Sequence, residues 1–333
     1  MIRLRFSVDD VSRIRFGFAP VREAVLGVRA LATPGRGAAL HTPWVRRVAP
    51  ALRTVDMELL GTLVRPAGYI PDFLIPVTRA RTESLDAGLA RIAATELTLV
   101  TEQLEHLAGH TLAQRGPGRA ARVARLRRLA ADPAVALGRI VAALRHYWTV
   151  ALAPDWPRVR ALLQADLSYR LEQLAEGGVR QLFRTLHPLV TLRGDTLEIV
   201  KYYDGLAHLD RRGLLLVPCV FAWPDVVVRT ADPQPTVTYP PRGLGRLWES
   251  VASPAPRANA LGDLIGRSRA RVLAQLDLPM TTTQLACLLD LSAPTLNVHL
   301  KTLRAAGVVS ARRHGRAVLY ARTDLGERLL GED

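Results

Sequence analysis

Two short helices joined by a tight turn are the feature of this 333-residue chain that most restricts its fold. In "TTTQLACLLD", Leu285 and Leu289 are four residues apart. In "LSAPTLNVHLKTLRAAG", Leu296, Leu300 and Leu303 recur at i, i+4 and i+7. Both spacings place apolar side chains on one face of a helix. The sequence therefore predicts two amphipathic helices that pack together as a helix-turn-helix.

Capping signals set the expected ends of these helices. The second helix is predicted over 292–306, because Ser292 is a good N-cap and Pro294 falls in the first turn, where a missing N–H costs nothing. Thr282 or Thr283 is the expected cap of the first helix.

The outward face of the second helix has the composition of a base-reading surface. If the leucines point inward, a 100° step per residue turns Pro294, Asn297, Val298 and Lys301 outward, with Thr295 at the flank. An amide suits adenine, an apolar atom suits the thymine methyl group, and a cation suits phosphate. We therefore expect this face to contact double-stranded DNA.

A basic hairpin is predicted directly after this helix. The segment "VVSARRHGRAVLYAR" has two alternating arms, four arginines and no acidic residue, which is typical of the wing of a winged helix, predicted over 309–322. The alternative is an ordinary solvated hairpin. The predicted DNA-contacting residues are Ser292, Pro294, Thr295, Asn297, Val298, Lys301, Arg312, Arg313 and Arg316.

The overall charge agrees with a polyanionic partner but does not require one. The formal net charge is +15, and basic side chains gain by displacing counterions from phosphates. Only Lys201 and Lys301 are lysines, so nearly all basic residues are arginines, a bias that GC-rich coding also produces.

The predicted fold class is α+β and predominantly helical. We expect a large N-terminal domain of mixed strands and helices over 1–252, which includes the possibility of two subdomains. A Pro-rich linker, "SPAPRANA", covers 253–260, and a winged helix-turn-helix domain covers 261–333. In the N-terminal domain we expect a strand, a turn, a strand and a helix in 1–32, a helix in 43–64 and mostly helices in 84–186. A hairpin is expected around 193–195, followed by further strands to residue 240, the last of them at an edge of the sheet. In the C-terminal domain, one helix is expected over 261–276.

The C-terminal motifs together resemble a known family. The segment "TQLACLLDLSAPTLNVHLKTLRAAGVVSARRHGRAVLYART" is similar to the winged-helix repressors of the arsenical-resistance (ArsR-like) class, which share a Ser-x-x-Thr-x-x-x-His-Leu-x-x-Leu helix and a glycine-arginine wing. The matching positions are Ser292, Thr295, His299, Leu300 and Leu303. The resemblance covers 257–333 and implies operator binding as a homodimer and repression that an effector releases. Residues 1–252 less specifically resemble the long N-terminal regions of such regulators in actinobacteria.

Metal sensing is not expected. The Cys-x-Cys pair of metal-sensing members aligns with Thr281 and Thr283, and Cys287 stands alone. A weaker metal candidate is "TEQLEHLAGH", where Glu102, His106 and His110 recur every four residues on one helical face. We favour an exposed polar stripe there.

The front of the chain carries no recognised catalytic motif, so we expect neither an enzyme nor a cofactor. No Gly-x-Ser-x-Gly elbow, phosphate-binding loop or His-Glu-x-x-His helix is present. Six arginines lie within 115–128, for which a solvated helix face is favoured over DNA contacts. Seven aromatic residues are core candidates, some of which could line a pocket for an apolar small-molecule effector: Trp44, Tyr69, Phe73, Tyr147, Trp148, Trp156 and Trp223.

The expected location is the cytoplasm, without membrane contact, because the start lacks an apolar signal core and the longest apolar run is too short to span a bilayer. Two hypotheses remain. The first is a DNA-binding transcriptional repressor, homodimeric, whose N-terminal region senses an effector or mediates dimerisation. The alternative is an enzyme or protein-interaction module that carries a nucleic-acid-binding C-terminal tail.

Overall fold

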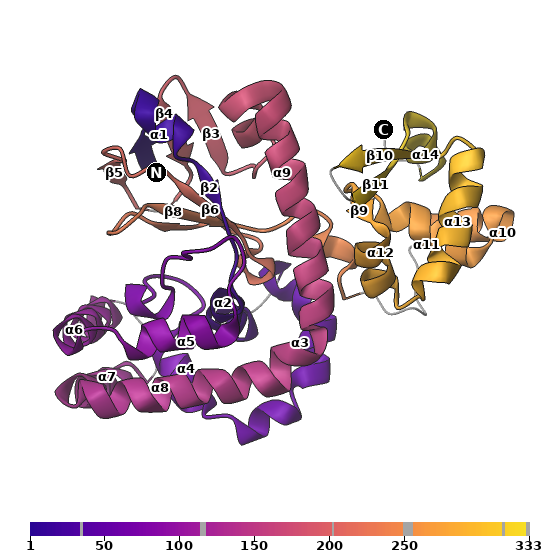
Figure 1. The fold of residues 1–333 in the computed structure, drawn as a ribbon. Helices are drawn as coiled ribbons and strands as arrows, with labels where there is room; N and C mark the ends of the chain where they lie inside the picture. Colours follow the sequence, from indigo (N-terminus) through magenta and orange to yellow (C-terminus); the bar gives the residue numbers. More distant parts are fainter. Residues whose placement is uncertain (34–35, 114–117, 202, 249–255, 315–316, 331–333) are drawn as a thin grey trace. The chain divides into compact units, whose positions relative to one another are not determined.

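The computed structural model describes residues 1–33, 36–113, 118–201, 203–248, 256–314 and 317–330 (Figure 1). Its contacts divide the chain into two units. Unit 1 comprises Met1–Pro154 and Phe183–Pro240, and unit 2 comprises Asp155–Leu182 and Pro241–Asp333. Helices and strands are mixed and helices predominate, so the predicted fold class is confirmed. In the described part of the chain, every helix is too short or too polar to cross a bilayer.

Unit 1 contains two four-stranded sheets, which bring together distant parts of the chain. In the first, of order β3-β4-β1-β5, the N-terminal strand lies between β4 and β5. The second has the order β2-β6-β8-β7. The strands are β1 (Ile2–Arg5), β2 (Arg15–Phe16), β3 (Val190–Arg193), β4 (Thr196–Ile199), β5 (Gly205–His208), β6 (Leu215–Pro218), β7 (Val227–Arg229) and β8 (Thr236–Tyr239).

The strand predictions are correct in part: β5 was not predicted, and the last strand differs in its position. The hairpin around Arg193–Asp195 is confirmed as β3 and β4, with Gly194 at φ 60° in the turn. The predicted edge strand is wrong: β8 is buried between β6 and β7. Its residues "TVTY" include two threonines that look exposed in sequence, but Thr236 and Thr238 are both completely buried.

Helix α2 (Pro20–Ala32) is the central helix of unit 1 and is buried on nearly every side. It carries two buried charged residues that bind the second sheet and the segment after it. Arg22 donates to the Thr238 hydroxyl at 2.9 Å. Glu23 accepts the N–H of Val220 at 2.9 Å and contacts the Cys219 thiol at 3.1 Å. These hydrogen bonds replace part of the hydration that Arg22 and Glu23 lose on burial.

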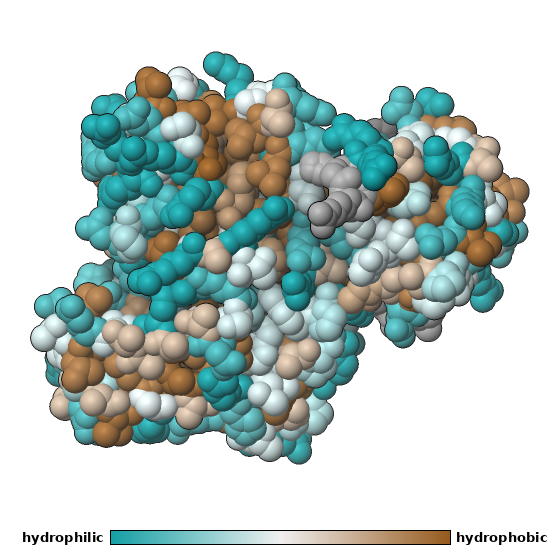
Figure 2. All heavy atoms as spheres, in the orientation of Figure 1, coloured by the Kyte–Doolittle hydropathy of each residue, from teal (hydrophilic) through white to brown (hydrophobic). Residues whose placement is uncertain are grey.

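Helix α1 (Val8–Ser12) lies beside the first sheet, in the upper part of Figure 1. The remaining helices of unit 1 form a separate layer, seen in the lower part of Figure 1. They are α3 (Thr42–Val48), α4 (Met57–Leu63), α5 (Leu85–Ala93), α6 (Leu97–Ala113), α7 (Arg119–Ala131) and α8 (Pro133–Tyr147). The single helix predicted over 43–64 is wrong, because a 3₁₀ turn at Ala51–Thr54 separates α3 from α4. Figure 2 shows apolar side chains scattered among polar ones over this layer, as on ordinary protein surfaces.

Unit 2 consists of the long helix α9 (Trp156–Arg184) as far as Leu182 and a C-terminal set of helices and strands. Gly178, at φ 63° and ψ −165°, breaks α9 near its end. The C-terminal set comprises α10 (Pro256–Ile265), α11 (Arg267–Gln275), β9 (Met280–Thr281), α12 (Thr282–Leu289), α13 (Ala293–Ala305), β10 (Val309–His314), β11 (Ala317–Arg322) and α14 (Asp324–Leu330).

Two details of unit 2 differ from expectation. The single helix predicted over 261–276 is two helices, because Gly266 at φ 89° interrupts the helical backbone. Residues 256–260 of the predicted linker belong to α10, and 253–255 lie outside the described residues. The contacts also group Asp155–Leu182 with the C-terminal residues. The proposed division at 253–260 therefore stays a prediction.

Candidate nucleic-acid interface

Helix α12 has Thr281 as its N-cap, one or two residues before the predicted Thr282 or Thr283. The Thr281 hydroxyl accepts the N–H of Gln284 at 3.2 Å, and the Gln284 side chain accepts the N–H of Thr281 at 2.8 Å. This reciprocal pair is a capping box. The prediction of Thr282 or Thr283 is therefore wrong, and the missed signal was the capping-box spacing Thr-x-x-Gln of Thr281 and Gln284.

The start of helix α13 is confirmed. Ser292 is the N-cap and accepts the N–H of Thr295 at 3.3 Å, and Pro294 lies in the first turn. Asp290, which ends α12, adopts a left-handed conformation at φ 54° and lets the chain turn between the helices. The tight turn therefore depends on the left-handed backbone of Asp290, the side-chain cap of Ser292 and the fixed backbone of Pro294.

The apolar faces of both helices are buried as their spacing predicts. Leu285 and Leu296 are completely buried, and Leu300 and Leu303 are almost so. The first turn of α12 also touches the second helix, since the Thr282 hydroxyl lies 3.4 Å from Oδ1 of Asn297. Packing and this contact together hold the orientation of α13.

The opposite face of α13 is open to solvent. Pro294, Thr295, Asn297, Val298 and Lys301 are all exposed. Val298 is 62% exposed and places an apolar group on this face. Within the described residues, Lys301 has no ion-pair partner, so its charge remains available to an anion.

The predicted basic hairpin exists and belongs to a larger sheet. Strands β10 and β11 pair antiparallel, and β9 pairs with β11 through Met280 and Thr281. Strand β9 is not predictable from the sequence, because two residues give no detectable alternation. Since Thr281 also caps α12, this sheet connects the wing to the first helix of the helix-turn-helix.

The three wing arginines that were predicted to contact DNA differ in what the structure shows of their surroundings. Arg312 forms an ion pair with Glu172 of α9, a contact that nothing in the local sequence indicated. Arg313 is exposed. Arg316 lies outside the described residues.

His299 and Cys287 carry no sign of a metal site. His299 is half-buried, and its Nδ1 has no hydrogen-bond partner in the described structure. Burial raises the pKa of the Cys287 thiol. The positions aligned with the metal-binding cysteines are the helix cap Thr281 and the exposed Thr283.

The histidine stripe of α6 is only partly assembled. His106 and His110 lie with their Nε2 atoms 3.1 Å apart, whereas Glu102 is exposed and joins neither. No group of three His, Cys, Asp or Glu side chains suited to a metal occurs in the described ranges. Of the arginines in 115–128, Arg122 donates to the Gly61 carbonyl at 2.6 Å and Arg125 pairs with Glu58, which supports a structural role for this run.

Comparisons with known proteins agree with this geometry. Residues 266–310 match the model of a family described as a helix-turn-helix domain, which includes α11, α12 and α13. Residues 93–244 match a family of unknown function (DUF5937). No curated protein and no solved structure matches the chain. The C-terminal part of the chain is therefore a helix-turn-helix domain, which supports DNA as its partner and transcription regulation as its role.

Proposed function

We propose that the protein is a transcriptional repressor of the ArsR-like winged-helix type, which binds operator DNA as a homodimer. The exposed face of α13 is the observation that carries this proposal. A helix capped at Ser292 and packed through three leucines presents an amide, an exposed valine and an unpaired lysine to solvent. Amide, apolar and cationic groups on one helix suit the major groove.

The proposed contacts divide by role. Asn297 and Val298 read base edges, with Pro294 and Thr295 at the entry of the helix, while Lys301, Arg313 and Arg316 neutralise phosphates. Ser292 positions the helix through its cap. Arg312 joins the phosphate contacts only after leaving Glu172. No step of this function requires catalysis by unit 1, for which we propose a sensing or dimerisation role.

Selection of duplexes from a randomised pool by the full chain tests the proposal. We expect enrichment of an inverted repeat, because a two-fold dimer reads two half-sites. Binding of all duplexes with equal affinity would contradict it.

A further inference from the structure

An open groove of about 590 Å³ on unit 1 is lined by many charged side chains that the proposed DNA contact does not use. Its walls are strand β2, the segment 72–79, helices α5 and α6 with the turn between them, and residues from 212–234, all of them in unit 1. Pockets of about 300–1,000 Å³ commonly hold small molecules. Phe73, one of the aromatic residues expected to line a pocket, lies in one wall.

Arginines dominate the charged lining of the groove. The ionised residues in its described walls are Arg15, Arg79, Arg91, Arg212, Arg229, Asp72 and Asp232. Three of the arginines form ion pairs. Arg229 pairs with Asp72 at 3.2 Å, and Arg91 donates to the Glu83 carboxylate behind the wall at 2.8 Å. The third is Arg212, so the charges of these three are largely neutralised.

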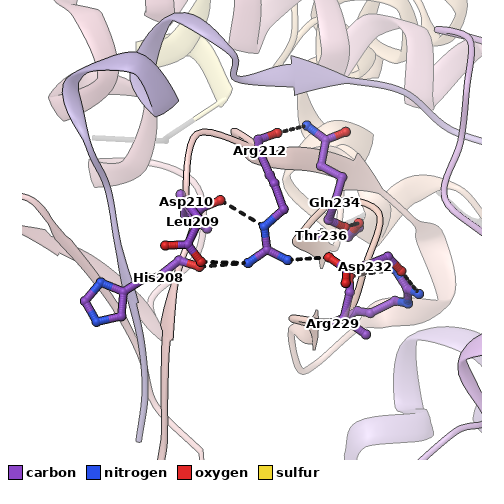
Figure 3. Close-up of polar contacts among 9 residues, drawn as sticks. His208, Leu209, Asp210, Arg212, Arg229, Asp232, Gln234 and Thr236 are labelled. Atoms are coloured by element: carbon purple, nitrogen blue, oxygen red, sulfur yellow. Dashed lines mark hydrogen bonds and ion pairs between the residues drawn. The ribbon is translucent and has the colours of Figure 1, made fainter.

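The contacts of Arg212 hold one wall of the groove in place (Figure 3). Its guanidinium pairs with Asp232 at 2.8 Å and with Asp210 at 3.4 Å, and it donates to the His208 carbonyl at 2.9 Å. The Arg212 carbonyl accepts from the Gln234 amide at 2.9 Å. A wall fixed in this way loses little conformational entropy when a ligand binds.

Arg15 and Arg79 are the two arginines of the lining that have no carboxylate partner in the described part of the chain. The Arg15 guanidinium donates to the side-chain oxygen of Gln234, which carries no charge. Arg79 is exposed, and only its backbone N–H is engaged, by the Glu83 carboxylate at 2.6 Å. Both positive charges therefore remain available to an anion. Even with Glu83 and Asp210 counted, arginines outnumber carboxylates around the described groove.

Strand β2 directs the Arg15 side chain toward the segment that carries Arg79. The N–H groups of Arg15 and Gly17 donate at 2.9 and 3.2 Å to two carbonyls in and just before β6, so the strand pairing continues past β2. Side chains two residues apart on a strand share a face. A Cβ at Gly17 would lie 3.2 Å from Cγ2 of Thr78. Arg15 therefore lies on the face of β2 that the segment 78–80 covers.

The rest of the described lining is mainly apolar. It consists largely of Phe73, Pro76, Val77, Ala94, Leu99 and Pro233. Leu99, in the first turn of α6, is 41% exposed. Phe73 is buried, and its N–H donates to the Gln103 side chain of α6 at 3.0 Å. The groove thus combines two available cations with an apolar wall.

We propose that this groove binds a small phosphate monoester with an apolar body, the phosphate at Arg15 and Arg79 and the body against Leu99. A phosphate monoester carries close to two negative charges at neutral pH, and the guanidinium fork matches its oxygens. Thr78, in the same wall, is 2% exposed, and its hydroxyl has no hydrogen-bond partner among the described residues, which leaves a polar group for a ligand oxygen to satisfy. The site is independent of the DNA contact, and only its role as a sensor rests on the proposed function.

Isothermal titration calorimetry of the full chain with phenyl phosphate tests the site, with benzoate and inorganic phosphate as reference ligands. We expect one site per chain and the tightest binding for phenyl phosphate, because it alone has both a phosphate and an apolar body. Equal affinity for benzoate would overturn the phosphate assignment, and equal affinity for inorganic phosphate would overturn the apolar contact. Absence of binding at millimolar phenyl phosphate would overturn the site itself.

Arg79→Gln should weaken the binding of phenyl phosphate about tenfold, because a charge-assisted contact is lost. Arg81→Gln is the matched control, since Arg81 is also exposed but lies outside the described lining, and it should bind normally. Both side chains are exposed, so we expect both variants to fold, and thermal unfolding checks this. Equal affinities for the two variants would overturn the placement of the phosphate.

Leu99→Gln tests the apolar wall separately. It should weaken the binding of phenyl phosphate and leave that of inorganic phosphate unchanged, because only the first ligand contacts the leucine. Leu97→Gln, at a 46% exposed position of the same helix outside the described lining, should change neither. Equal effects of the two leucine variants would overturn the apolar contact. Because no DNA is present, all these outcomes are distinct from failure of operator binding.

Discussion

Individual side chains of the proposed DNA-binding surface have different roles, either in base recognition or in phosphate contact. Asn297 and Lys301 lie on the same helix, yet only the amide can distinguish bases, since the lysine acts as a point charge. The structure also shows that a predicted contact can be occupied within the protein, as Arg312 is by Glu172. Such occupancy cannot be predicted from sequence, because the two residues are 140 positions apart.

Replacing Asn297 should reduce the sequence specificity of DNA binding, whereas replacing Lys301 should reduce the affinity for every duplex. Asn297→Ala should reduce discrimination between the selected operator and altered duplexes by about 1–3 kcal/mol. Lys301→Ala should weaken all duplexes equally and reduce the slope of log K against log salt by about 0.9. Fluorescence anisotropy over a salt series measures both.

Thr302→Ala is the matched control for these variants. Thr302 is exposed on α13, but its hydroxyl donates to the Val298 carbonyl at 3.1 Å, so it has no donor left for a base. Identical losses for the asparagine and lysine variants on every sequence would contradict the assignment.

Removing the partner of Arg312 should strengthen DNA binding. Glu172→Gln keeps the side-chain shape but removes the charge, so Arg312 no longer gives up an ion pair to reach phosphate. Because Arg312 is 63% exposed, we expect a modest gain, about two- to fivefold, at low salt that disappears at high salt. Arg312→Ala in the same background should abolish the gain, and its persistence would disprove this explanation.

The buried Glu23 should make stability depend on pH. Burial raises the pKa of Glu23 from 4.5 to about 7, although N–H donors of Val220 and Phe221 oppose the change. Between these values the folded state binds more protons than the unfolded state, so stability falls as pH rises from about 4.5 to 7 and is constant above. The loss is on the order of 3 kcal/mol.

Glu23→Gln keeps an acceptor for Val220 without a titrating group. Thermal unfolding at several pH values should therefore show a flatter profile for this variant. Glu105→Gln, at an exposed position, should retain the wild-type slope. Parallel profiles for Glu23→Gln and the wild type would show that another group is responsible.

Elements differ in how far local sequence determines them. The leucine spacing, the Ser292 cap and the alternating arms predicted α13 and the wing because each is a contact within one element or between neighbours. The position of β1 between β4 and β5 was not predictable, since its pairing joins residues about 200 apart. Breaks at Gly266 and at Ala51–Thr54 were missed because apolar periodicity continued through them.

The cap of α12 offers a test at this scale. Thr281→Ala should lower the free energy of unfolding by about 1 kcal/mol, because the N–H of Gln284 loses the hydroxyl that accepts its hydrogen bond. Thr283→Ala, on the exposed face of the same helix, should change it by much less. Chemical denaturation followed by circular dichroism compares the two. A larger cost for Thr283 would reverse the cap assignment.

At the scale of the whole molecule, the proposed function requires two copies. A single winged helix contacts few base pairs, and a two-fold dimer doubles the readout. Multi-angle light scattering at micromolar concentration should therefore give twice the mass of one chain, 36.5 kDa. A monomer, both free and on selected DNA, would contradict the dimer.

Unit 2 is discontinuous, since Asp155–Leu182 is separated from Pro241 by a return of the chain to unit 1. During synthesis on the ribosome, α9 emerges long before the helices that complete unit 2. It therefore cannot form its contacts within that unit until residues 241–333 have been synthesised. A protease cut in 249–255 would likewise leave α9 on the N-terminal fragment. Neither biosynthesis nor proteolysis can therefore deliver unit 2 as one contiguous piece.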